Sequence, residues 1–125
     1  MRIIQTENMP QSNGHYSQVV EHNGILYLSG QLPINPGTRQ VAATIEEQAA
    51  QALANVDVLL READSGRQFV LKATLYIADI SLWDKVNAVY TDFFGTHKPA
   101  RSIVPTKELH FGSLIEIEVI ATLKH

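Results

Sequence analysis

The chain has 125 residues, 45% of them hydrophobic and 18% charged, with a formal net charge of −3. This composition is typical of one globular domain over residues 1–125, and it excludes a disordered tail or a coiled coil. The absence of cysteine excludes disulfides, thiolate nucleophiles and sulfur-ligated metal sites, and the acidic balance disfavours nucleic acid as the main partner.

The N-terminal part of the chain predicts three strands followed by a loop. Residues 2–6, "RIIQT", predict a short edge strand. Apolar runs at 17–22 and 25–31 flank Asn23-Gly24, a pair that tolerates positive φ and is the strongest short signal for a β-hairpin. The next stretch, "GQLPINPGTRQVAA", is rich in Pro and Gly, so we expect a loop there.

A long amphipathic helix is predicted after this loop. Thr44-Ile45-Glu46-Glu47 has the form of a capping box, which satisfies free N–H groups at the start of a helix. Apolar residues then recur at helical spacing until Gly66, which supplies a stop signal. Residues 69–78 are apolar and β-branched enough for a central strand.

One more helix and two more strands complete the predicted order. The helix begins at Asp79 or Ser81 and closes at Gly95. The segment around Arg101 predicts a stiff, extended strand, because prolines on either side restrict the backbone. The residues of "SLIEIEVIATL", at 113–123, alternate between an apolar and a mixed face, which is typical of a strand.

The order β-β-β-α-β-α-β-β predicts an α+β fold. Both helices need an apolar surface to cover, and a single mixed sheet with both helices on one face meets that need. The other face, with Glu116, Glu118 and Ile120, is half polar and half apolar and has no helix left to cover it. We therefore expect copies of the chain to pack on that face in a cyclic oligomer.

Arg101 is the first candidate for chemistry. Its guanidinium stays charged and can hold a carboxylate with two parallel hydrogen bonds. The prolines at 99 and 105 would give a binding arginine a rigid support. The structural alternative is an arginine paired with Glu116, Glu118 or a chain carbonyl.

Glu116 is the second candidate, because a half-buried carboxylate can have its pKa raised into a range useful for catalysis. Solvation, or a pair with Arg101, would explain it equally well.

Asn87 lies among apolar residues of the second predicted helix, either as a satisfied amide or as a ligand contact. Gly30 permits a ligand to approach its backbone N–H closely. Ser29 alone is a weak signal, as is the phenol of Tyr16.

Several kinds of site have no support in the sequence. The five histidines, at 15, 22, 97, 110 and 125, form no metal-like pattern. There is no phosphate-binding or dinucleotide-binding glycine motif. No apolar run approaches the roughly 18 residues of a membrane span, and the N-terminus lacks a signal sequence. We expect a cytoplasmic protein that binds no metal and does not span a membrane.

Five blocks, in order, resemble one known family. They are "GHYSQ" at 14–18, "YLSGQLP" at 27–33, "VNAVYTDFF" at 86–94, "KPARS" at 98–102 and "LIEIEVIA" at 114–121. They span nearly the whole chain, and together they are similar to the RidA/YjgF family. This resemblance implies a chorismate-mutase-like fold in a homotrimer with clefts between subunits. It also implies a cofactor-free deaminase that converts 2-aminoacrylate or 2-aminocrotonate to a 2-keto acid and ammonia.

The resemblance also implies a role for individual residues. By position, Arg101 matches the arginine that binds the substrate carboxylate, and Glu116 matches the glutamate that holds the catalytic water. Residues matching the cleft lining are Tyr16, Ser29, Gly30, Asn87 and Ile103. Many family members have a cysteine where this chain has Ile103, which supplies only its backbone N–H. "TKELHFGS" also replaces the more usual "ARLPKD" type of segment.

Two functions of different classes follow from these observations. The first is an enamine or imine deaminase that uses Arg101 as a carboxylate clamp and Glu116 as the proton carrier. The second is a non-catalytic trimer that binds a small carboxylate or regulates a partner. Both need Arg101, but a protein that only binds does not need Glu116.

Overall fold

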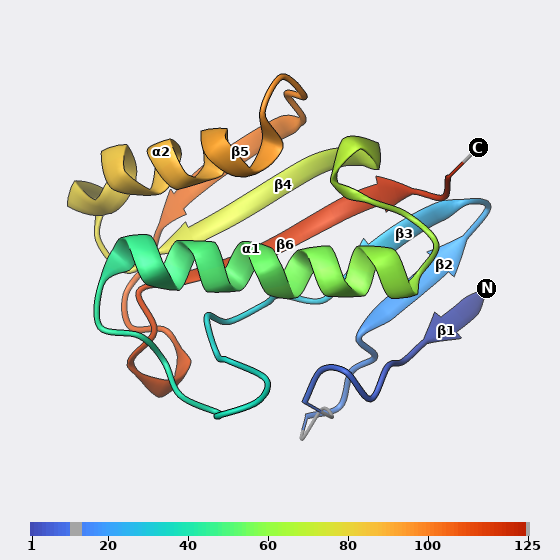
Figure 1. Cartoon of the computed structure of the whole chain (residues 1–125), viewed down its shortest axis with the longest axis horizontal. Coiled ribbons are helices and arrows are strands. Elements are labelled where there is room, and N and C mark those ends of the chain that lie inside the picture. The colour runs from blue at the N-terminus through green and yellow to red at the C-terminus, as the bar shows by residue number, and fades with distance from the viewer. Residues whose placement is uncertain (11–13, 125) are drawn as a thin grey trace.

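The computed structural model describes residues 1–10 and 14–124, which form a six-stranded sheet with two helices on one face (Figure 1). The strands are β1 (Arg2–Ile4), β2 (Val19–His22), β3 (Ile25–Leu28), β4 (Val70–Ile77), β5 (Ala100–Pro105) and β6 (Ile115–Thr122). The helices are α1 (Ile45–Glu62) and α2 (Trp83–Phe94). The predicted α+β class, element order and two-layer arrangement are confirmed.

The strand order in the sheet is β1-β2-β3-β6-β4-β5. Neighbouring strands are antiparallel except β4 and β5, which are parallel. Helix α2 connects these two, as a parallel pair requires a crossover. The sheet is therefore mixed, with β6 and β4 near its centre and β5, which carries Arg101, at one edge.

The predicted hairpin joins β2 and β3. Asn23 and Gly24 have φ angles of 52° and 81°, as the two central residues of such a turn require. Strand β3 ends at Leu28, earlier than predicted, and the chain meets β6 again through a single bridge at Gln31. The Gln31 N–H donates to the carbonyl of Ile117 at 2.7 Å. This bridge brings the 29–31 segment against β6.

Helix α1 begins as its sequence predicts. The Thr44 hydroxyl oxygen accepts the Glu47 N–H at 3.2 Å and donates to the Glu47 carboxylate at 2.8 Å. Two buried amides on the helix tie down neighbouring segments. Gln48 donates to the carbonyl of Ala42 at 2.8 Å and accepts the Leu114 N–H at 2.8 Å. Asn55 donates to two carbonyls of the loop after Gly30.

Helix α2 begins later than predicted. Asp79 accepts the Ser81 N–H at 2.8 Å, but this contact opens a 3₁₀ turn at Ile80–Leu82, and the α-helix starts at Trp83. At its other end Gly95 has a φ of 63°, which stops the helix where the sequence indicates. The face of α2 toward the sheet buries Val86, Tyr90 and Phe94.

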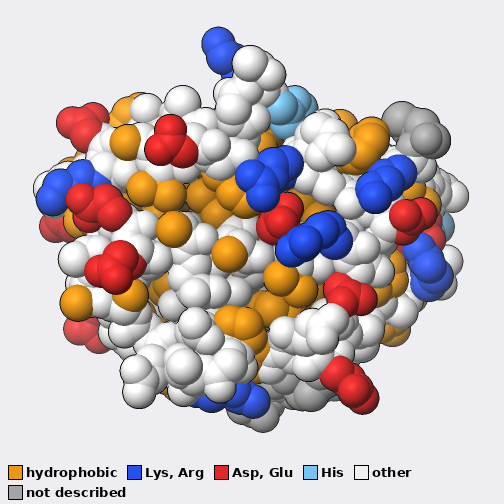
Figure 2. All heavy atoms as spheres, viewed as in Figure 1, with side chains coloured by type: hydrophobic (Ala, Val, Ile, Leu, Met, Phe, Trp, Pro, Cys, Tyr) orange, Lys and Arg blue, Asp and Glu red, His pale blue; other side chains and the backbone are white. Residues whose placement is uncertain are grey.

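Strand β6 shows the predicted alternation, and it separates the two faces of the sheet. Ile115, Ile117, Val119 and Ala121 are buried under the helices, whereas the residues between them are only half-buried. On the helix face of the molecule, acidic and basic side chains are interspersed (Figure 2). In the described part of the chain, no helix has the length and apolar character needed to cross a membrane.

Candidate functional site

Arg101 lies on β5 and turns toward α2. One of its terminal nitrogens donates to Oδ1 of Asn87 at 2.8 Å. The centre of its guanidinium lies 4.9 Å from the ring of Tyr90 and 5.4 Å from that of Trp83. Among the described residues no carboxylate forms a salt bridge with Arg101. Within one chain, the alternative of a structural pair with Glu116 or Glu118 is therefore wrong.

The three partners of Arg101 come from a single face of α2. Trp83, Asn87 and Tyr90 are spaced by four and three residues, so they lie one above the other along the helix. Aromatic faces attract a guanidinium, and the amide oxygen fixes its rotation. This arrangement orients the cation without neutralising it, because the amide that accepts its hydrogen bond carries no charge.

A cavity of about 420 Å³ opens beside this arginine. Its lining consists of Asn87, Tyr90, Thr91, Phe94, Gly95, His97, Lys98, Pro99 and Arg101. The charged residues of this lining are cationic, and none of the described lining residues is acidic. An arginine that has no carboxylate partner in the described chain and lies in such surroundings favours a small anion, above all a planar carboxylate.

Glu116 lies on the open face of β6, directly opposite Tyr76 on β4. Burial raises the pKa of its carboxyl, and the charge of Glu118 raises the pKa further, whereas the charge of His110 acts in the opposite direction. Glu118 itself accepts a hydrogen bond from the Tyr76 hydroxyl at 2.6 Å. Glu116 therefore holds a proton at higher pH than an ordinary glutamate, which suits general acid–base chemistry.

Gly30 lies against this carboxylate. A Cβ atom added to Gly30 would overlap with Oε2 of Glu116, so the position accommodates no side chain while that carboxylate stays in place. Gly30 does not have a positive φ. Its role is close approach rather than unusual backbone geometry.

Ser29 and Tyr16 are connected through the backbone. The Ser29 hydroxyl donates to the carbonyl of Ser17 at 2.6 Å, and the Ser29 N–H donates to the carbonyl of Gln18 at 3.0 Å. These bonds hold the segment that carries Tyr16 beside Gly30. Tyr16 itself is exposed to 56%. Ser29 thus orients this part of the site, with its hydroxyl proton engaged within the chain.

Ile103 lies on β5, two residues after Arg101, and so points to the same face of the sheet. It is opposite Leu75 on β4 and packs partly buried against the core. Since β5 is the outermost strand, one of its edges has no neighbouring strand among the described residues. Its backbone remains available at that edge, whereas its side chain contributes hydrocarbon only.

The predicted site residues form two separate groups within one chain. Arg101 is opposite Ala73 on β4, which is opposite Val119 on β6, and both of these are buried under the helices. Directly opposite residues share a face of the sheet. Arg101 thus lies on the helix side, together with Asn87, while Glu116 lies on the open side with Gly30. The sequence could not predict this division.

Two further residues near these groups were not predicted as part of a site. His110, in a 3₁₀ turn at His110–Gly112, lies close enough to Glu116 for its charge to affect the pKa of that carboxyl. Tyr90 has a buried hydroxyl with no hydrogen-bond partner, beside Arg101. Tyr90 is one of the apolar residues of the second predicted helix, and its helical spacing predicts only a core position. No signal in the sequence connects His110 with Glu116, because a loop of unpredictable geometry joins them.

Comparison with known proteins identifies the family. The family model described as Endoribonuclease L-PSP matches residues 6–123. A RutC family protein of Aquifex aeolicus is 43% identical over 123 residues, which cover 97% of this chain and 98% of the relative. The chain belongs to this family, which includes the RidA/YjgF proteins.

Solved structures agree with this assignment. A protein of the conserved Rid family from Yersinia pestis is 44% identical, with a TM-score of 0.93 and 98% of each chain covered. TdcF of E. coli, solved with bound serine, is 32% identical, with a TM-score of 0.93 and coverage of 99% of this chain and 100% of TdcF. The predicted membership of the RidA/YjgF family is thus confirmed. Within the described residues, no group of His, Asp and Glu side chains could hold a metal ion.

Proposed function

We propose that this protein is an enamine/imine deaminase that hydrolyses small 2-imino acids, such as those formed from 2-aminoacrylate and 2-aminocrotonate, to 2-keto acids and ammonia. The observation that carries the proposal is the state of Arg101: an amide and two aromatic rings orient its guanidinium, and no carboxylate in the described chain neutralises it. An anionic substrate would complete its contacts. The serine in the TdcF structure is likewise a small α-carboxylate.

The reaction needs only groups that the chain supplies. Protonation of the terminal carbon of the enamine gives the imine, which is already an electrophile. Water then adds to the imine carbon, a proton passes to the nitrogen, and ammonia leaves as the carbonyl forms. Glu116 is suited to move these protons through an ordered water, because its raised pKa makes its protonated form more accessible than that of an ordinary glutamate. Arg101 fixes the carboxylate and thereby the reacting carbon.

Two copies of the chain would form each complete site in the homotrimer that we propose. Arg101 and Glu116 point to opposite faces of one sheet, so one substrate molecule can reach both only if they come from different copies. The open face of the sheet carries Tyr27, Val104 and Ile120, apolar side chains that are exposed or half-buried. Packing copies on this face would bury them and bring Glu116 to the boundary.

The other functions considered have less support. A protein that only binds a carboxylate has no use for a partly buried glutamate with a raised pKa. The family description names an endoribonuclease. The net charge of −3 and the interspersed charges of Figure 2 favour a small anion over an RNA backbone.

The decisive test is hydrolysis of freshly generated 2-aminoacrylate. A serine dehydratase would supply the enamine, and ammonia release with and without the protein would be compared. We expect Arg101→Ala to weaken transition-state binding by about 2 to 5 kcal/mol, because it removes a desolvated charge contact. Arg101→Lys should recover only part of this loss. Lys85→Ala, an exposed change on α2, is the matched control. Equal rates for Arg101→Ala and wild type would refute the carboxylate clamp.

A further inference from the structure

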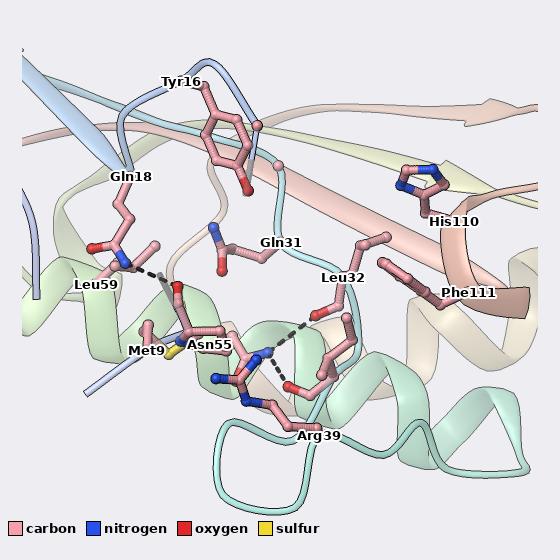
Figure 3. A pocket seen from close by; sticks show the side chains of 14 residues that line it. Met9, Tyr16, Gln18, Gln31, Leu32, Arg39, Asn55, Leu59, His110 and Phe111 are labelled. Atoms are coloured by element: carbon pink, nitrogen blue, oxygen red, sulfur yellow. Dashed lines mark hydrogen bonds between the residues drawn. The ribbon is translucent and has the colours of Figure 1, made fainter. Parts of the chain in front are cut away.

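A second cavity has Gly30 in its lining together with Asn55 and Leu59 of α1, and Figure 3 shows the two α1 residues below Gln31. Its volume is about 420 Å³, within the range of cavities that hold small-molecule ligands. The methyl group of an alanine-derived imine would occupy only a small part of it. The cavity is thus larger than the smallest substrates of the proposed reaction require.

The cavity is next to the group proposed to move protons. Gly30, where an added Cβ would overlap with the Glu116 carboxylate, also lines the cavity. His110 lines the same cavity, and its charge is felt by Glu116. In Figure 3, Tyr16 and His110 both lie at the rim above Gln31. A substrate carbon held near Glu116 would therefore have its side chain directed at the opening.

The interior of the cavity is mainly hydrocarbon, supplied by Met9, Leu32, Ile34 and Leu59. The amide groups among them are already occupied by the chain itself. Asn55 donates to the carbonyls of Leu32 and Ile34 at 3.0 and 2.9 Å. Gln31 donates to the carbonyl of Ser29 at 3.0 Å. Arg39 also lines the cavity, with its guanidinium beside Asn55 in Figure 3, so a ligand that enters would meet mainly apolar atoms and one cationic side chain.

Phe111 forms the outer wall and is held in an uncommon conformation. Its φ and ψ are 59° and 30°, in the left-handed region that bulky residues rarely adopt. Its side chain is 70% exposed, and its ring centre lies 4.9 Å from that of His110. Backbone strain of this kind is concentrated at sites that clamp ligands. An exposed aromatic ring at the mouth of an apolar cavity is suited to cover an apolar ligand.

We infer that this cavity receives the side chain of the substrate, and that the protein acts preferentially on 2-imino acids with branched aliphatic or aromatic side chains. The inference rests on the proposed deaminase function and deepens it. The chemistry is unchanged: water adds to the imine carbon, the C–N bond breaks, and a 2-keto acid and ammonia form. The cavity would select among substrates by burying the substrate side chain, because burial is favourable in proportion to the apolar area removed from water.

The test compares imines formed from alanine, leucine and phenylalanine by an amino-acid oxidase with catalase. Semicarbazide traps the imine that remains, so faster hydrolysis appears as less semicarbazone. For wild type we expect the larger imines to give the higher kcat/KM. Phe111→Gly suits the positive φ and removes the ring, while Ile34→Phe fills the cavity. Each variant should lower the ratio of two kcat/KM values, that for the phenylalanine-derived imine over that for the alanine-derived imine, at least tenfold.

Ile80→Ala is the control, because Ile80 is an exposed apolar residue outside the cavity. The ratio of kcat/KM values measured for this variant should equal that of wild type. The inference is overturned if wild type hydrolyses only the alanine-derived imine, or if neither cavity variant changes the ratio. If no imine is hydrolysed, the deaminase proposal fails separately. Binding of 4-methyl-2-oxopentanoate and of pyruvate, followed by calorimetry, then decides: tighter binding of the larger keto acid supports the cavity assignment, and equal binding refutes it.

Discussion

At the scale of single residues, the molecule separates the cation that we propose to bind the substrate carboxylate from the carboxyl that we propose to move protons. Arg101 is fixed by neutral partners on α2, which leaves its charge for a ligand. Glu116 is half-buried beside another carboxylate, so its ionised form is disfavoured. Neither environment favours stability by itself, and the proposed reaction would use both: the free cation for an anionic substrate and the protonated carboxyl for a basic leaving group.

Glu116 should reduce stability as the pH rises. Its pKa in the folded chain lies above its ordinary value of 4.5, so between these values the folded chain holds more protons than the unfolded one. The free energy of unfolding then falls as pH rises through this window. Glu116→Gln should therefore unfold at a higher temperature than wild type at pH 7, with no such gain at pH 3.5. Glu108→Gln, an exposed change, should show little difference at either pH. An equal gain at both pH values would exclude ionisation as the cause.

Gly30 should be intolerant of a side chain because of Glu116, not because of its backbone. Gly30→Ala places a methyl group where the carboxylate lies, so we expect at least a tenfold loss of kcat/KM together with a measurable loss of thermal stability. Glu116→Ala removes the obstacle. Adding Gly30→Ala to that variant should therefore cost less stability than adding it to wild type, as a double-mutant cycle would reveal. Additive effects would show that the clash lies elsewhere.

At the scale of elements, local signals in the sequence predicted what local physics controls. The Asn23-Gly24 turn, the Thr44 cap and the alternation of β6 all depend on neighbouring residues. The start of α2 was misplaced because Asp79 caps a 3₁₀ turn instead of the α-helix itself. The faces of Arg101 and Glu116 depend on which strands are neighbours and in which register. Those are long-range properties, which the residues around each position do not encode.

Helix α1 anchors the segment that leads into Glu116. Gln48 is 3% exposed and satisfies both the carbonyl of Ala42 and the N–H of Leu114, two residues before Glu116. We expect Gln48→Leu to cost about 1 to 3 kcal/mol for each buried group left unpaired, measured by urea unfolding. Gln51→Leu, the same change about one turn along the helix at a half-buried position, should cost less. A loss no larger than that of Gln51→Leu would contradict the anchoring role.

At the scale of the whole molecule, the catalytic proposal requires more than one chain. The sheet separates Arg101 from Glu116, and each would act on a substrate bound between copies. A site shared between copies predicts a recovery of activity that a site within one chain could not give. Arg101→Ala and Glu116→Gln should each be inactive alone, yet a mixed trimer of the two variants should contain a site that has Arg101 from one copy and Glu116 from another.

Co-expression with two affinity tags would isolate trimers that contain both variants. In a cyclic trimer whose sites each take one residue from either neighbour, every mixed assembly has one complete site, so activity should return to about one third of the wild-type value. Arg101→Ala mixed with the double variant Arg101→Ala/Glu116→Gln is the matched control, because no arrangement of those chains restores an arginine. Activity in the control mixture, or none in the test mixture, would show that the site is not shared. Restoration limited to the test mixture would place the arginine and the glutamate of each site on different copies, which is why neither face of the isolated sheet carries a complete site.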